Sequence, residues 1–119
     1  MSACKHTPAA WTVDERTCSL DGVSITWTIF SRDRICIADG QSQEHLGDTG
    51  IHEDESRANA RLIAAAPDML SALRSSRDVL ARAIKAAAPD LFESDEDVNE
   101  HLAIKRMDAA IARAVGGAA

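Results

Sequence analysis

The sequence contains few aromatic residues and few cations. Only 3% of its 119 residues are aromatic, and 13 Lys and Arg face 19 Asp and Glu, which gives a formal net charge of −6. Neutralising nucleic-acid phosphates requires clustered Lys and Arg, so this balance argues against a general nucleic-acid-binding protein. The chain also lacks a run of 18 apolar residues and the apolar core of a signal peptide, so we expect a cytoplasmic protein without membrane contact.

Cysteine is scarce as well. Cys4, Cys18 and Cys36 show no C-x-x-C spacing, a pattern that favours reduced thiols over a disulfide framework. Zinc sites normally show two pairs of ligands, and the sequence offers one weak pair, Cys4 and His6. Because a glycine-rich phosphate loop and a nucleophile elbow are also missing, we predict no metal site, no cofactor and no enzymatic activity.

Alanine, by contrast, is abundant, with 22 residues within an apolar fraction of 45%. Each alanine buries little surface, so the core of a monomer should be thin, and alanine-rich helices can pack closely against a partner chain. We therefore predict a homo-oligomer. The length favours a single domain over residues 1–119, with residues 1–10 as a flexible N-terminus.

Residues 11–38 predict a three-stranded antiparallel meander. The clearest strand is Gly22–Phe30, in which apolar and polar residues alternate with a period of two. Trp11–Glu15 precedes it as a short strand and Ile35–Ala38 follows it as the third. The alternation predicts that Trp27 faces the core, whereas Phe30 points to the opposite face, where it is available to an interface or a ligand.

The remaining sequence predicts a loop over residues 39–53 and a helical part over residues 54–116, which together with the sheet make an α+β fold. Apolar residues recur at three- and four-residue steps, and Pro67 should divide the first helical segment by a kink or a short break. Ser94 and Asp97 have the spacing of a capping box at the start of the next helix, which Gly116-Gly117 should end. We therefore expect two or three alanine-rich helices that pack in an oligomer.

Concentrated arginines are the best candidates for a binding site. A guanidinium group binds phosphate in a bidentate manner, and nearby aromatic rings can stack on a base. The predicted ligand-binding residues combine a pair of arginines four residues apart on the first helix, the asparagine between them, two turn arginines and one tryptophan: Arg57, Asn59, Arg61, Arg32, Arg34 and Trp11. The alternative is that these arginines form ion pairs with Asp54, Glu55 and Asp68.

Two segments resemble a class of small phage and prophage proteins. One is the Thr-Pro-x-x-Trp segment within His6–Trp11, and the other is the Asn-Ala-Arg-Leu-Ile-Ala-Ala-Ala-Pro stretch within Ala58–Leu70. In outline the chain is similar to the Ead-type accessory proteins of lambdoid phages. Two departures are the pair Ala9-Ala10, where Gly-Pro is common, and the acidic segment from Pro89 to Glu100.

The resemblance implies a phage accessory protein that acts against host defence in the host cytoplasm. One expectation is a sponge that holds a nucleotide-derived immune signal between subunits without turnover. Another is an inhibitor similar to anti-CRISPR proteins, in which acidic residues between Asp90 and Glu100, or the loop 39–52, contact a host defence nuclease. A structural accessory factor without a small-molecule pocket is the third alternative.

Overall fold

The computed structural model describes residues 6–17, 24–42 and 50–116. These residues divide into two compact units, a sheet unit from His6 to Asp68 and a helical unit that begins at Met69. Outside the described residues lie Cys4, Cys18, Gly22 at the start of the predicted strand, residues 43–49 of the predicted loop, and Gly117.

The sheet unit contains three antiparallel strands in the order β1-β2-β3, as predicted. They are β1 (Thr12–Thr17), β2 (Ile25–Phe30) and β3 (Cys36–Gln41). Val13 lies opposite Ile29 on β2, and Ile29 lies opposite Ala38 on β3. Beyond Ile29 the pairing with β3 shifts by one residue, because Phe30 pairs with Cys36.

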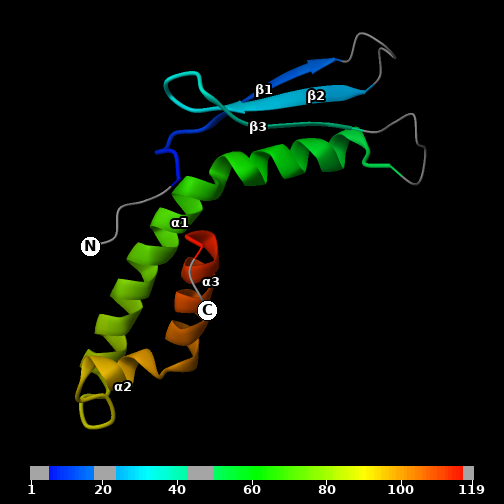
Figure 1. Ribbon diagram of the computed structural model, residues 1–119. Helices are drawn as coiled ribbons and strands as arrows, with labels where there is room; N and C mark the ends of the chain where they lie inside the picture. The colour runs from blue at the N-terminus through cyan, green and yellow to red at the C-terminus, as the bar shows by residue number, and fades with distance from the viewer. Residues whose placement is uncertain (1–5, 18–23, 43–49, 117–119) are drawn as a thin grey trace. The chain divides into compact units, whose positions relative to one another are not determined.

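The helix α1 (Glu53–Ala87) begins in the sheet unit, where its first part runs along one face of the sheet (Figure 1). Alternate residues of β2 are buried on that face, as the period of two predicted. Trp27, Ile29 and Ala60 form the core cluster, against which Trp11 and Ile63 pack. Three acidic residues, Glu53, Asp54 and Glu55, occupy the first turn of α1, where the helix dipole favours them.

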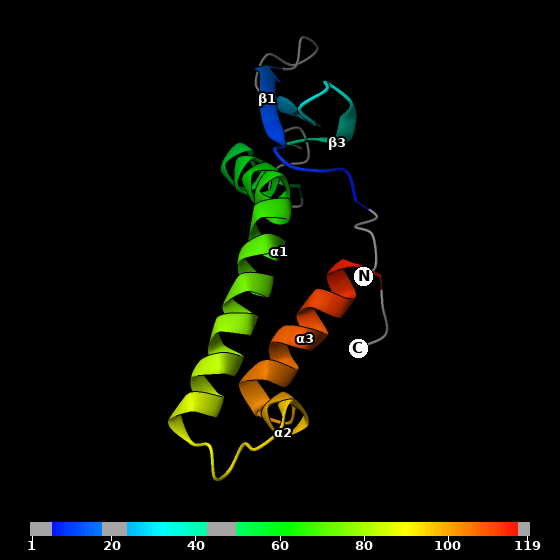
Figure 2. The same ribbon diagram turned by 90° about the vertical axis from the view of Figure 1, so that its left-hand side faces the viewer.

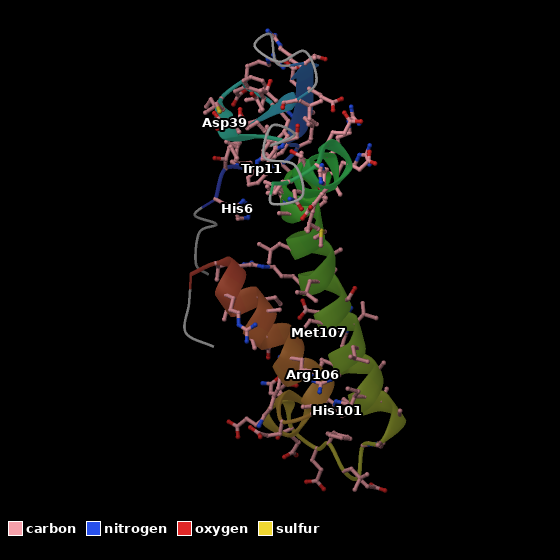
Figure 3. All side chains as sticks on the ribbon, turned by 90° about the vertical axis from the view of Figure 1, so that its right-hand side faces the viewer. His6, Trp11, Asp39, His101, Arg106 and Met107 are labelled. Carbon is pink, nitrogen blue, oxygen red and sulfur yellow. The ribbon has the colours of Figure 1, made fainter. Side chains whose placement is uncertain are left out.

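The helical unit consists of the second part of α1, α2 (Asp95–Asn99) and α3 (Leu102–Ala114). Within it, α1 and α3 lie side by side and run in opposite directions, joined through α2 (Figure 2). Val98 and Ile104 are buried, and Met107 lies on the side of α3 that faces α1 (Figure 3). The core of this unit is thin, as the alanine content predicted.

Several predicted boundaries are wrong. Trp11 precedes β1, which continues to Thr17, and β3 extends to Gln41, so residues 39–41 belong to a strand and not to the predicted loop. Hydrogen bonding across the sheet carries both strands past the point at which their apolar alternation stops. The helix begins at Glu53, one residue earlier than predicted.

The helical part also differs from the prediction. Of the kink or short break predicted at Pro67, the break is absent, because α1 is continuous through this buried residue. The kink stays a prediction. The predicted capping box of Ser94 and Asp97 is confirmed, but it opens only the short α2. The extended backbone of His101 separates α2 from α3, and the Nδ1 atom of His101 accepts a hydrogen bond from the N–H of Ala103. Because His101 caps a new helix, the structure has two helices, α2 and α3, where the sequence predicted one.

Candidate functional site

Of the six predicted site residues, Arg57 and Arg61 line one cavity. This cavity, here called the Trp27 pocket, has a volume of about 190 Å³ and lies between β1, β2 and the first part of α1. Its lining consists of Val13, Glu15, Trp27, Arg57, Ala60 and Arg61. Asn59, Arg32, Arg34 and Trp11 do not belong to this lining.

Arg57 is surrounded by carboxylates. Its Nε donates a hydrogen bond to Glu15, and its Nη1 lies 3.5 Å from an oxygen of Glu53 and 3.8 Å from one of Asp54. The hydrogen bond to Glu15, together with these charges, raises the pKa of Arg57 above its ordinary value. The ion pair with Asp54 agrees with the alternative interpretation of this arginine, and an anionic ligand would have to compete with three carboxylates.

Arg61 and Asn59 are exposed on α1, and neither side chain has a hydrogen bond or an ion pair among the described residues. Arg61 is therefore the cation of the Trp27 pocket whose charge is not compensated within the described part of the chain. Trp11 is half-buried against the core cluster, and its indole N–H donates to the carbonyl oxygen of Thr7. His6 makes an edge-to-face contact with Trp11 (Figure 3), so this tryptophan fixes the entry of the chain into the sheet.

Arg32 and Arg34 occupy the turn that follows β2, as predicted. The backbone of Arg34 is left-handed, with φ of 63°, and its guanidinium group lies 4.3 Å from the centre of the Phe30 ring. The aromatic face that we expected to meet a partner is thus covered by an arginine of the same chain. Arg32 is exposed and has no partner among the residues that the structure describes.

A second and larger cavity was missed by sequence reasoning. The α1–α2 cleft, in the helical unit, has a volume of about 420 Å³. Residues of α1 form one wall and residues of α2 the other: Arg77, Asp78, Ala81, Arg82, Lys85, Asp95, Val98 and Asn99. Small-molecule sites usually measure about 300–1,000 Å³, so this cleft, unlike the Trp27 pocket, has the size of a ligand site.

Three cations converge on the cleft, and they differ in how firmly each is held. Arg77 donates from Nε to Asp108 at 2.9 Å and from Nη2 to Asn99, and its hydrogen bond to Asp108 raises the pKa of Arg77 above its ordinary value. Lys85 lies 3.2 Å from a carboxylate oxygen of Asp95, which is largely exposed. The side chain of Arg82 has no hydrogen bond or ion pair within the described ranges. The sequence contains basic residues at 77, 82 and 85, but it does not reveal that α2 packs opposite them and forms the second wall of the cleft.

No three His, Cys, Asp or Glu side chains among the described residues come together as a metal site would require. None of the helices built from them has the length and hydropathy needed to cross a membrane.

Comparison with known proteins identifies a family but no characterised relative. No curated protein and no solved structure matches the chain. One family model does match, over residues 1–118, and its description is Salmonella phage P22 protein Y8K6. This match supports the predicted phage protein. Since the model covers almost the whole sequence, the chain belongs to the family of Salmonella phage P22 protein Y8K6.

Proposed function

We propose that this phage protein captures a small anionic ligand of the nucleotide type in the α1–α2 cleft and releases it unchanged. The observation that carries the proposal is the position of Arg82, an exposed arginine without a partner among the described residues, at the rim of a cavity of ligand size. Arg82 is three residues from Lys85 on α1, so both cations can reach one phosphate group.

The opposite wall of the cleft suits the rest of a nucleotide. Asp95 presents carboxylate oxygens that accept hydrogen bonds from an exocyclic amino group of a base. Asn99 accepts a hydrogen bond from Arg77 through its Oδ1 atom, so its side-chain N–H groups are left to donate to a ligand. The lining thus holds three cations and two carboxylates, an arrangement that fits a ligand carrying a negative phosphate and a base with hydrogen-bond donors.

Capture without turnover is the expectation drawn from the sequence, in which we found neither a glycine-rich phosphate loop nor a nucleophile elbow. The likeness of the sequence to phage accessory proteins suggests a biological use, which is to withdraw a nucleotide immune signal from the host. The proposal includes three predictions made from the sequence. The protein forms a homo-oligomer, it is related to the Ead-type accessory proteins, and it acts in the host cytoplasm.

Thermal unfolding in the presence of candidate ligands tests the proposal. The panel comprises inorganic phosphate, mononucleotides, cyclic dinucleotides, cyclic trinucleotides and cyclic ADP-ribose isomers. A ligand at a hundredfold excess over its Kd should stabilise the fold by about 2.7 kcal/mol. Mass spectrometry of the recovered ligand should show it unchanged. If no anionic compound shifts the transition, the proposal is wrong.

Two matched variants locate the site. Arg82→Ala should abolish the ligand-induced shift, whereas Arg74→Ala, which removes an exposed α1 arginine outside the cleft, should leave it intact. Arg61→Ala tests the alternative site, the Trp27 pocket, which contains two of the ligand-binding residues predicted from the sequence. Loss of binding in Arg61→Ala but not in Arg82→Ala would move the site to the Trp27 pocket.

A further inference from the structure

Leu91 has the largest exposed fraction among the big apolar side chains that the structure describes, at 76%. It lies in the turn between α1 and α2, where the backbone N–H groups of Leu91 and Phe92 both donate to the carbonyl oxygen of Ala88. Phe92 is half-buried and contacts the ring of His101. The turn is therefore built from internal contacts, and it presents Leu91 without a further loss of backbone freedom on binding.

Two carboxylates flank this side chain. Asp90 precedes Leu91 and Glu93 follows two residues later, and among the described residues neither has a cationic partner. An exposed apolar side chain between two unpaired negative charges is complementary to a binding surface that combines an apolar pocket with an unpaired cation.

The Trp27 pocket has these properties. Val13, Ala60 and the ring of Trp27 supply apolar surface, and the volume of about 190 Å³ suits one side chain, because cavities of about 150 Å³ accept a benzene molecule. Of its two cations, Arg57 is paired with Glu15 within the pocket, whereas Arg61 has no partner in the described part of the chain.

We propose that Leu91 of one copy of this chain inserts into the Trp27 pocket of a second copy, with Asp90 or Glu93 paired to Arg61. Two features of the same molecule support this occupant: the exposed leucine matches the pocket in size, and its flanking charges match the free cation. The inference is independent of the ligand in the α1–α2 cleft, whose lining shares no residue with either surface.

The proposed contact joins two different surfaces, so it is a heterologous interface. Such interfaces produce rings when the rotation between copies closes, and open chains when it does not. Because one side chain provides most of the apolar contact, the association should be weak and should fall with protein dilution and with salt.

Sedimentation velocity of the full chain over a range of concentrations tests this assignment. We expect the wild type to associate, and Leu91→Ser and Arg61→Glu each to weaken association by about 30-fold, the loss typical of an anchor residue. The matched control is Leu102→Ser, which alters another exposed leucine of the helical unit, at 60%, and should leave the association unchanged.

Mixing the two weakened variants gives the sharper result. Leu91→Ser keeps an intact pocket and Arg61→Glu keeps an intact leucine, so an equimolar mixture should form dimers through the one remaining interface. Combining Arg61→Glu with Asp90→Arg and Glu93→Arg should restore association through reversed charges. A wild type that is monomeric at every soluble concentration, association that survives both single variants, or a mixture that stays monomeric would overturn the proposal. A monomer that nevertheless binds an added acidic, leucine-containing peptide would show a foreign occupant, which also overturns it.

Discussion

Trp27 shows how a single residue organises the sheet unit. It is 8% exposed, and its indole N–H donates a hydrogen bond of 2.9 Å to the hydroxyl oxygen of Ser56 on α1. On its other side the ring lies against Gly40 of β3, where an added Cβ would approach the ring carbons to 2.3 Å. A buried tryptophan is stable when its N–H finds a partner, and Ser56 supplies that partner.

Gly40→Ala should therefore destabilise the fold by about 1–3 kcal/mol, because the new methyl group collides with the rigid indole. Urea unfolding followed by tryptophan fluorescence measures the change. Asp39→Ala is the control, since it alters the exposed neighbouring position of the same strand. Equal stability of Gly40→Ala and the wild type would mean that the ring moves aside without cost.

At the scale of single residues, the sequence predicted the roles that depend on local pattern. The period of two placed Trp27 in the core correctly, and the ion pairing of Arg57 with Asp54 was foreseen as an alternative. Glu15 as a partner of Arg57 was not foreseen, because it lies 42 residues away in the sequence. The cleft at Arg82 depends in the same way on long-range packing of α1 against α2, which periodicity does not reveal.

Among the secondary-structure elements, type and order were more predictable than extent. The β-branched residues of β2 and the alanine-rich helices identified an α+β fold, because these patterns report local propensity and burial. The predicted ends of β3 were wrong, because the strand extends as far as it pairs with β2. The division between α2 and α3 was not predicted, because it depends on His101 as an N-cap. The break that Pro67 was expected to cause is also absent, because the sheet unit buries this residue within a continuous helix.

Arg77 holds the three helices of the helical unit together. It extends from α1 to Asp108 on α3 and to Asn99 at the end of α2. The pKa of Arg77 is raised, so its contribution to stability is fully present below the ordinary arginine pKa and is constant across the neutral range. Such a contact fixes the register of α1 against α3, which a stripe of small apolar residues specifies poorly.

A double-mutant cycle with Arg77→Ala and Asp108→Ala should give a coupling free energy of about 1 kcal/mol, the upper end of the range for partly exposed pairs. Chemical denaturation followed by circular dichroism provides the four unfolding free energies. The more exposed pair of Lys105 and Glu100, at 2.7 Å, is the matched control and should couple by only a few tenths of a kcal/mol. Equal coupling in the two pairs would refute the register role of Arg77.

For the whole molecule, the division into two units predicts how it unfolds. Both tryptophans, Trp11 and Trp27, belong to the sheet unit, and tyrosine is absent from the chain. Fluorescence therefore reports the sheet unit, while circular dichroism at 222 nm reports mainly the helices. Gly40→Ala should lower the fluorescence midpoint more than the circular dichroism midpoint, and Arg77→Ala should do the reverse. Coincident shifts in both variants would show one cooperative unit.

The boundary between the units at Asp68 and Met69 also has a consequence for synthesis. All described residues of the sheet unit lie before this boundary, and those of the helical unit lie after it. Chains emerge from the ribosome N-terminus first, and domains generally fold as units during synthesis. The sheet unit can therefore close its core around Trp27 before the helical unit is complete. We expect this nascent sheet, already holding the first part of α1, to provide the folded end from which the rest of the helix grows.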